Sequence, residues 1–113
     1  MRIYVAGPYS APTLEERITN ANSAIDAGLA LMEKGHSPFI PHLSHYADER
    51  ALDTQGSRRT WADWMKLDLD FLEQCEGLLF LAPSFGANIE LRRAREMGKL
   101  VFYSLEDVPR HVI

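Results

Sequence analysis

The sequence predicts an α/β fold in which helices cover both faces of a parallel sheet of four to five strands. Short apolar runs alternate with segments whose apolar residues recur at the helical period, and strands that alternate with helices form parallel sheets. Capping residues and glycines mark where these helices begin and end. The chain has 113 residues, of which 46% are hydrophobic, so it is long enough for one core and too short for two. We therefore expect a single domain over residues 1–113.

The first part of the chain predicts a strand, a long helix and a second strand. Ile3 to Ala6 is a short apolar run that ends at a Gly-Pro pair. Thr13 to Glu16 has the pattern of a capping box and opens a helix that we expect to stop at Gly35. Ser37 to Ile40 is a second short run, which a proline ends.

The rest of the chain predicts a loop followed by helix, strand, helix and strand. The helices are expected from about Thr60 to Cys75 and from about Gly86 to Met97, and the strands from Gly77 to Ala82 and from Leu100 to Tyr103. The segment from Pro41 to Ser57 is long for so small a domain and carries histidines, a tyrosine and an arginine. We therefore expect it to be a binding loop or lid rather than a connector.

Composition narrows the classes of partner. The formal net charge is −4, and no basic cluster extends beyond Arg58-Arg59 and Arg92-Arg93, which argues against nucleic acid or an anionic membrane and favours a small molecule. Neither a membrane-spanning run nor a signal-peptide core is present in the sequence. The single cysteine, Cys75, is expected to be a packing thiol in a reducing compartment. Together these features predict a cytoplasmic protein.

The third expected helix places a carboxylate on its apolar face. At about 100° per residue, Glu90 falls inside the apolar stripe rather than on the opposite, charged side. The stripe is formed by Ala87, Leu91, Ala94 and Met97. Because Glu90 lies in the first turns, we expect the helix dipole to keep it ionised, while an anion such as phosphate docks beside Ser84 and Gly86. The alternative is a surface pair of Glu90 with Arg93.

The second expected helix repeats this arrangement. Asp68 lies within its apolar face, whereas Asp70 points to solvent and needs no role. The apolar face is formed by Trp61, Trp64, Met65, Leu72 and Cys75. A carboxylate on such a face is costly unless it is paired or lines a cavity, so two of them on neighbouring helices argue for a site. Asp68 has an alternative as a core carboxylate bonded to a backbone N–H or an arginine. The two tryptophans are expected in the core or in a dimer contact.

Two further residues have both a functional and a structural interpretation. Tyr4, in the first strand, either fills the core or forms a hydrogen bond with Glu90. His42, just past a strand end, either contacts the substrate or is a solvated loop histidine. His42 and His45 lack a third ligand at a recognisable spacing, so we expect no metal. No Rossmann or P-loop glycine pattern is present in the sequence, and we expect no cofactor.

Three motifs follow one another at characteristic spacings. They are Ile3-Tyr4-Val5-Ala6-Gly7-Pro8-Tyr9-Ser10, then Leu67-Asp68-Leu69-Asp70-Phe71-Leu72-Glu73-Gln74-Cys75, and finally Ser84-Phe85-Gly86-Ala87-Asn88-Ile89-Glu90 with Ala94 and Gly98-Lys99. Together they resemble the nucleoside 2-deoxyribosyltransferase superfamily, which includes nucleoside 5′-monophosphate N-glycosidases. The resemblance covers nearly the whole chain. It implies a flavodoxin-like, three-layer sandwich that cleaves an N-glycosidic bond and acts as a homodimer or higher homo-oligomer.

The resemblance also implies roles for individual residues. Glu90 would be the nucleophile, Asp68 the second carboxylate, and Tyr4 the tyrosine that positions the nucleophile. The first substrate loop would comprise Gly7, Pro8, Tyr9 and Ser10, and the phosphate-contacting turn Ser84 and Gly86. On this basis Glu90 attacks C1′ of the sugar while Asp68, its pKa raised by burial, manages the proton on the departing base.

The sequence departs from the resemblance at two places. The transferases carry a longer C-terminal part that completes the neighbouring subunit's site, whereas this sequence reaches Ile113 soon after its fourth strand. Hydrolysis of a nucleoside 5′-monophosphate is therefore the first expectation, with base exchange and a non-catalytic nucleotide sensor as alternatives. The first loop also lacks the arginine that hydrolases often carry there, so phosphate binding would rest on serines, helix N–H groups and an arginine such as Arg50, Arg58 or Arg59.

Overall fold

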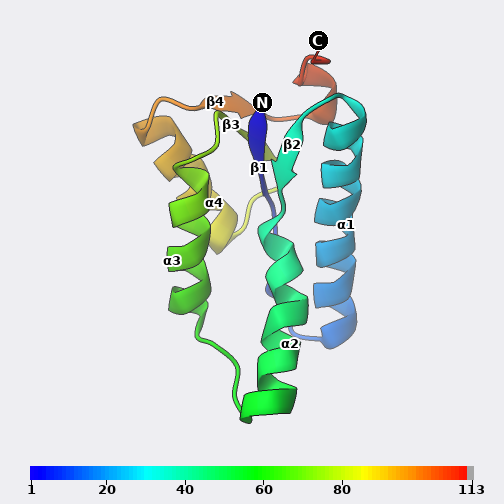
Figure 1. The fold of residues 1–113 in the computed structure, drawn as a ribbon, viewed down its shortest axis with the longest axis vertical. Coiled ribbons are helices and arrows are strands. Elements are labelled where there is room, and N and C mark those ends of the chain that lie inside the picture. The colour runs from blue at the N-terminus through cyan, green and yellow to red at the C-terminus, as the bar shows by residue number, and fades with distance from the viewer. Residues whose placement is uncertain (112–113) are drawn as a thin grey trace.

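Four parallel strands form the central sheet of the computed structural model, which describes residues 1–111 (Figure 1). Val112 and Ile113, the last residues of the expected domain, lie outside the described part. The strands are β1 (Arg2–Ala6), β2 (Ser37–Phe39), β3 (Gly77–Phe80) and β4 (Leu100–Phe102), in the spatial order β2-β1-β3-β4. This order is the flavodoxin-like one, so the expected α/β fold class is confirmed.

Helices cover both faces of the sheet, as predicted from the alternation of strands and helices. Figure 1 shows α1 on one face and α3 and α4 on the other, which makes three layers. The helices are α1 (Leu14–Glu33), α2 (Ser44–Gln55), α3 (Trp61–Leu72) and α4 (Phe85–Glu96), with short 3-10 turns η1 (Pro41–Leu43) and η2 (Leu105–Asp107). The Thr13 side chain accepts a hydrogen bond from the Glu16 N–H at the start of α1, and Gly35 follows the helix with φ of 88°. The predicted starts and stops therefore hold to within a few residues.

One expected segment is wrong. The loop predicted from Pro41 to Ser57 is largely helical, because η1 and the twelve-residue α2 occupy most of it, and Gly56 ends α2 in the left-handed region with φ of 78°. Figure 1 shows α2 extending beyond the sheet, antiparallel to α3. The segment carries no apolar stripe, since the one residue that α2 buries is His45. A helix whose inward face carries polar side chains toward a cavity, rather than apolar ones toward the core, does not show the periodicity that identifies amphipathic helices in a sequence.

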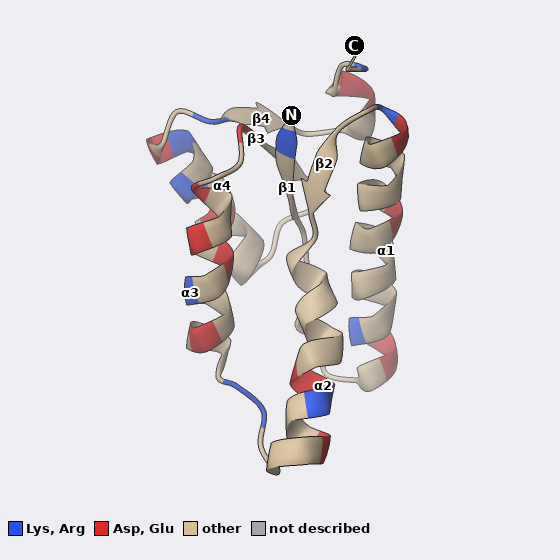
Figure 2. Cartoon of the chain, in the orientation of Figure 1, with Lys and Arg blue, Asp and Glu red and all other residues tan. Residues whose placement is uncertain are grey.

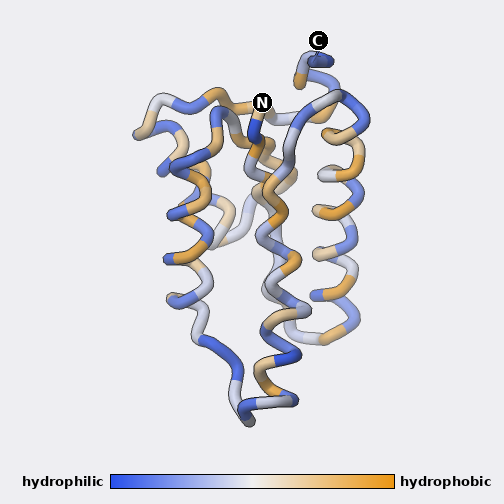
Figure 3. Tube along the Cα trace, in the orientation of Figure 1, coloured by the Kyte–Doolittle hydropathy of each residue, from blue (hydrophilic) through white to orange (hydrophobic). Residues whose placement is uncertain are grey.

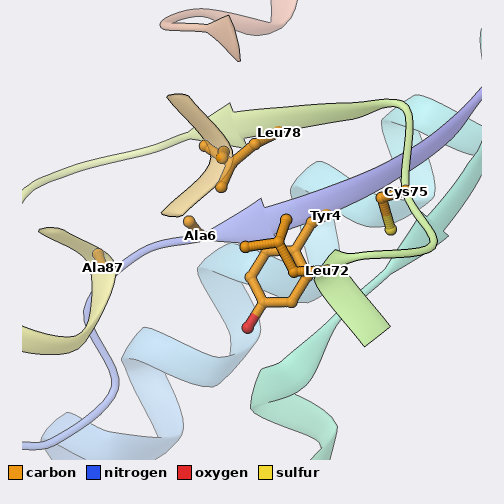
Figure 4. Packing of buried hydrophobic residues seen from close by; sticks show 7 residues of the cluster. Tyr4, Ala6, Leu72, Cys75, Leu78 and Ala87 are labelled. Atoms are coloured by element: carbon orange, nitrogen blue, oxygen red, sulfur yellow. The ribbon is translucent and has the colours of Figure 1, made fainter. Parts of the chain in front are cut away.

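The core consists of two clusters, one on each face of the sheet. In β1, Ile3 and Val5 pack under α1, whereas Tyr4 and Ala6 pack under α3 and α4, as the alternation of side chains along a strand requires. Figure 4 shows Tyr4 in this second cluster beside Leu72, with its hydroxyl oxygen at the end of the ring away from the strand. The central strand β1 is therefore buried on both faces.

Charged residues lie mainly on the outward parts of the helices (Figure 2), and hydrophobic stretches follow the strands and alternate with hydrophilic ones along the helices (Figure 3). Within residues 1–111, no helix combines the length and the apolar character needed to cross a bilayer. Cys75 is buried in the cluster beneath α3, where it packs as expected.

The two faces of α1 predict contrasting effects of the same substitution. Leu31→Ala removes a fully buried side chain and should lower the free energy of unfolding by about 2–5 kcal/mol. Leu29→Ala, two residues away at a position that is 55% exposed, should change it by less than about 0.5 kcal/mol. Urea unfolding followed by circular dichroism measures both, and equal losses would show that α1 does not pack through Leu31.

Candidate active site

A cavity of about 600 Å³ lies at the carboxyl ends of the parallel strands. Its lining includes Gly7 after β1, Pro41 and His42 after β2, and Ser84 after β3. In the order β2-β1-β3-β4, the chain leaves β1 toward one edge and later returns to β3 on its other side. Ligands of open α/β sheets bind at this reversal, beyond the carboxyl ends of the strands. The cavity therefore lies where ligands bind in folds of this kind.

Glu90 lies on the wall that α4 contributes to the cavity. Glu90 is only 5% exposed. The hydroxyl of Tyr4, on β1, donates a hydrogen bond to Glu90 Oε2. Both interpretations of Tyr4 hold in the structure. Its ring packs in the core, and its hydroxyl forms a hydrogen bond with Glu90. The alternative of a surface pair is excluded, since Arg93 pairs with Glu73 and Glu96 instead.

Burial, rather than the helix dipole, controls the charge of Glu90. Loss of solvation raises the pKa of Glu90 to about 8; the Tyr4 hydrogen bond lowers it and the Asp68 carboxylate raises it again. The direction of this pKa shift runs against the expectation that the helix dipole keeps Glu90 ionised near neutral pH. Glu90 is the sixth residue of α4, in the second turn, where backbone N–H groups are already bonded and the dipole has weakened.

Asp68 faces the same cavity from α3. A capping box formed by Thr60 and Asp63 begins this helix and fixes its rotation, and Asp68 is 9% exposed whereas Asp70 is exposed beside Lys66. Both positions agree with the sequence prediction. Oδ1 of Asp68 is buried and has no hydrogen-bond partner among the described residues, and burial raises the pKa of Asp68 to about 7.

The loop after β1 forms the floor of the cavity and is held from both sides. Asn20 and Arg17 of α1 donate to the carbonyl oxygens of Tyr9 (3.1 Å) and Ala11 (3.0 Å). On the other side, the Tyr9 hydroxyl lies 2.5 Å from Nδ1 of His45 on α2. Of the expected loop residues, Gly7, Tyr9 and Ser10 line the cavity, whereas Pro8 does not.

His42 is buried at the end of β2 and is not a solvated histidine. Its Nε2 lies 3.0 Å from the Gly7 carbonyl oxygen and 3.1 Å from that of Pro8, so Nε2 carries the proton and donates. Burial lowers the pKa of His42, which keeps the ring neutral with Nδ1 as an acceptor. Nδ1 has no hydrogen-bond partner among the described residues. His42 therefore supports the first loop and leaves an acceptor atom at the cavity.

The N-terminus of α4 has the features of an anion site. Ser84 is the N-cap, and its hydroxyl accepts a hydrogen bond from Ala87 N–H at 3.1 Å. The N–H groups of Phe85 and Gly86 precede the first intrahelical bond and so remain available to a ligand. Among the three arginines considered, Arg59 lines the cavity, whereas Arg58 pairs with Asp48 and Glu49 and Arg50 lines a separate hollow.

Several cavity residues escaped the sequence analysis as site residues. They are His45 and Asp48 on α2, Trp61, Trp64 and Met65 on α3, and Phe85 on α4. The tryptophans were expected in the core or a dimer contact, yet their helical spacing ahead of Asp68 places them on the same face as that carboxylate. The α2 helix was not predicted, so its residues were expected only as part of a binding loop. In residues 1–111, no group of three or more His, Cys, Asp or Glu side chains is arranged to hold a metal ion.

Comparisons with known proteins place this geometry in context. No protein-family model and no curated protein sequence matches the chain. Among solved structures, the chain is similar to 2-desoxiribosyltransferase from Leishmania mexicana, with a TM-score of 0.59 over 88% of this chain and an identity of 18%. The chain has a nucleoside 2-deoxyribosyltransferase-like fold. It spans 61% of the length of that solved structure. At this identity the similarity concerns the fold alone.

The raised pKa of Glu90 predicts how stability depends on pH. The folded protein holds this proton up to a pKa of about 8, whereas the unfolded chain releases it near 4.5, so stability should decline as pH rises through this window and level off above it. Titration of Glu90 lowers the free energy of unfolding by at most about 1.4 kcal/mol per pH unit. Glu90→Gln cannot ionise and should remove it, which would raise the melting temperature relative to wild type by several degrees at pH 9 and little at pH 5. Thermal melts at both pH values measure this, and a constant difference would contradict it.

Proposed function

We propose that the chain hydrolyses the N-glycosidic bond of a nucleoside or deoxynucleoside 5′-monophosphate. The observation that supports this is that Glu90 and Asp68, two buried carboxyl groups on different helices, line the same cavity. No lysine or arginine among the described residues forms an ion pair with either group. Buried carboxyl groups without a cation are costly in a purely structural role, and they suit proton transfer and nucleophilic attack.

The proposed reaction divides the work between the two carboxyl groups. Tyr4 holds Oε2 of Glu90, which leaves Oε1 to attack C1′ of the sugar. As the bond between C1′ and the base nitrogen breaks, its electron pair goes to the base and Asp68 supplies a proton there. Water then attacks C1′, the bond from Glu90 breaks, and Asp68 takes the proton that the water releases. The free base and the sugar phosphate leave.

The phosphate of the substrate would bind at the N-terminus of α4. The N–H groups of Phe85 and Gly86 and the guanidinium of Arg59 are the positively polarised groups at the cavity, and Ser10 adds a hydroxyl at its edge.

Base exchange between nucleosides is the second candidate, because the similar solved structure is a 2-desoxiribosyltransferase. A second free base would then take the place of water at C1′. A homodimer, implied by the sequence resemblance, also stays a proposal; the apolar side chains Leu67 and Phe71 on α3 are exposed and available for such a contact.

Removal of the nucleophile should abolish turnover. Glu90→Gln should lower base release from nucleoside 5′-monophosphates by about 10³-fold or more, because no other described carboxylate replaces it beside Tyr4. Chromatography of a panel of nucleosides and nucleotides, with and without a second free base, measures release and exchange separately. Unchanged turnover in Glu90→Gln would refute the nucleophile, and binding of nucleotides by wild type without either reaction would leave a sensor domain.

The second carboxylate has a matched control on its own helix. Asp68→Asn should lower kcat by about 10²–10⁴-fold through loss of the proton donor. Asp70→Asn, at an exposed position two residues on, should leave kcat within about twofold. Equal losses in the two variants would mean that the α3 face toward the cavity has been misassigned.

The pH profile should report the pair rather than either residue alone. Attack needs Glu90 ionised and leaving-group protonation needs Asp68 protonated, so the active form holds one proton between them. With pKa values of about 7 and about 8 in the free protein, kcat/KM should rise toward pH 7 and fall above pH 8. Residual activity of Asp68→Asn should rise and then level off, because its descending limb has been removed. A descending limb that persists in Asp68→Asn would contradict this assignment.

A further inference from the structure

A hydrogen bond joins the two helices that face each other across the cavity. Nε1–H of Trp64, on α3, donates to Oδ1 of Asp48, on α2, at 3.0 Å. In residues 1–111 it is the only hydrogen bond that connects α2 directly to α3. Figure 1 shows the two helices side by side, with the connecting segment at their far end.

Asp48 is itself held firmly. Its Oδ1 also accepts a hydrogen bond from the Arg59 backbone N–H at 3.0 Å, and its Oδ2 lies 3.6 Å from Nε of Arg58. The Asp48 side chain is 18% exposed. Because the indole N–H can only donate and a carboxylate is a strong acceptor, this contact fixes the orientation of the Trp64 ring.

The Trp64 ring separates two hollows. It lines the main cavity, and it also lines a smaller hollow of about 260 Å³ against α2. Trp64 precedes Asp68 by four residues on α3, so the two side chains are neighbours on the same helix face. The indole therefore stands beside the carboxyl group that would protonate the departing base.

The other aromatic residues of the cavity are less suited to this position. Trp61 and Phe85 lie against each other with ring centroids 5.6 Å apart, but they are 49% and 76% exposed. Neither ring is fixed by a hydrogen bond to another described residue, and Trp61 is a further turn away from Asp68. They form the outer rim, whereas Trp64 is half-buried and anchored.

We propose that the indole of Trp64 is the surface on which the substrate's nucleobase stacks, that Asp48 is a positioning residue for it, and that the site consequently favours purine over pyrimidine nucleotides. This inference rests on the proposed function, because the base is the group that Asp68 would protonate. A purine has the larger stacking face, and a ring fixed in advance loses little freedom when the base binds. Discrimination between substrates would therefore depend on the nucleobase, which is the leaving group.

Substitution of Trp64 should change substrate preference as well as affinity. Trp64→Leu should raise KM for purine nucleoside 5′-monophosphates by about 5- to 150-fold, with a smaller rise for pyrimidine ones and a nearly unchanged kcat. Asp48→Ala should reduce the purine preference in the same direction, and Asp48→Asn should restore most of it, because its amide oxygen still accepts from the indole. Asp53→Asn, an exposed carboxylate change on the same helix, should leave the preference unaltered.

A binding measurement makes the test independent of turnover and of how the variants fold. In Trp61→Phe, Trp64 is the only tryptophan, and its fluorescence should be quenched by a purine mononucleotide more strongly than by a pyrimidine one. Emission that a saturating purine mononucleotide leaves unchanged, or a Trp64→Leu variant that loses kcat/KM equally for both classes, would overturn the inference. Quenching without base release would refute the proposed function alone, whereas base release without quenching would refute this inference alone.

Discussion

The hydrogen bond between Tyr4 and Glu90 connects the most buried strand of the sheet to the cavity, and the arrangement of the site depends on it. Tyr4 is fully buried in β1, paired in register with Phe39 on one side and Leu78 on the other. Its hydroxyl emerges from the apolar cluster at the point where Glu90 approaches from α4. Burial and the neighbouring carboxyl group raise the pKa of the Tyr4 hydroxyl well above its ordinary value, so it remains a donor. The apolar core thus holds the Tyr4 hydroxyl in a fixed position as a hydrogen-bond donor to the buried Glu90 carboxyl group.

The same burial explains the electrostatics of the cavity. Glu90 and Asp68 both have raised pKa values because desolvation outweighs the other influences on them. Neighbouring histidine does not offset this, since burial also disfavours the cationic form of His42. The groups that favour an anion are the backbone N–H groups at the start of α4 and the Arg59 guanidinium. The cavity consequently combines groups suited to proton exchange with groups suited to negative charge.

Local patterns predicted much of this arrangement, and tertiary effects account for what they missed. The positions of Glu90 and Asp68 followed from helical periodicity, which depends on near neighbours in the chain. The helix α2 did not, because its inward face borders the cavity and carries His45 and Asp48 instead of apolar residues. The contact of Asp48 with Trp64 joins residues from two helices and could not be inferred without the first of them. The charge state of Glu90 was misjudged for a related reason, because its burial is a product of the assembled fold. The catalytic roles stay predictions.

The order of the strands also governs how the chain can assemble. β1 comes first along the sequence, yet it occupies an inner place in the sheet between β2 and β3. Its partners follow only from residues 37 and 77 onward, so this strand has no neighbour until two long stretches have been closed. Until then its edges are open to other chains. Aggregation during biosynthesis is therefore expected to be governed by residues 2–6, of which all but Arg2 are buried in the finished protein.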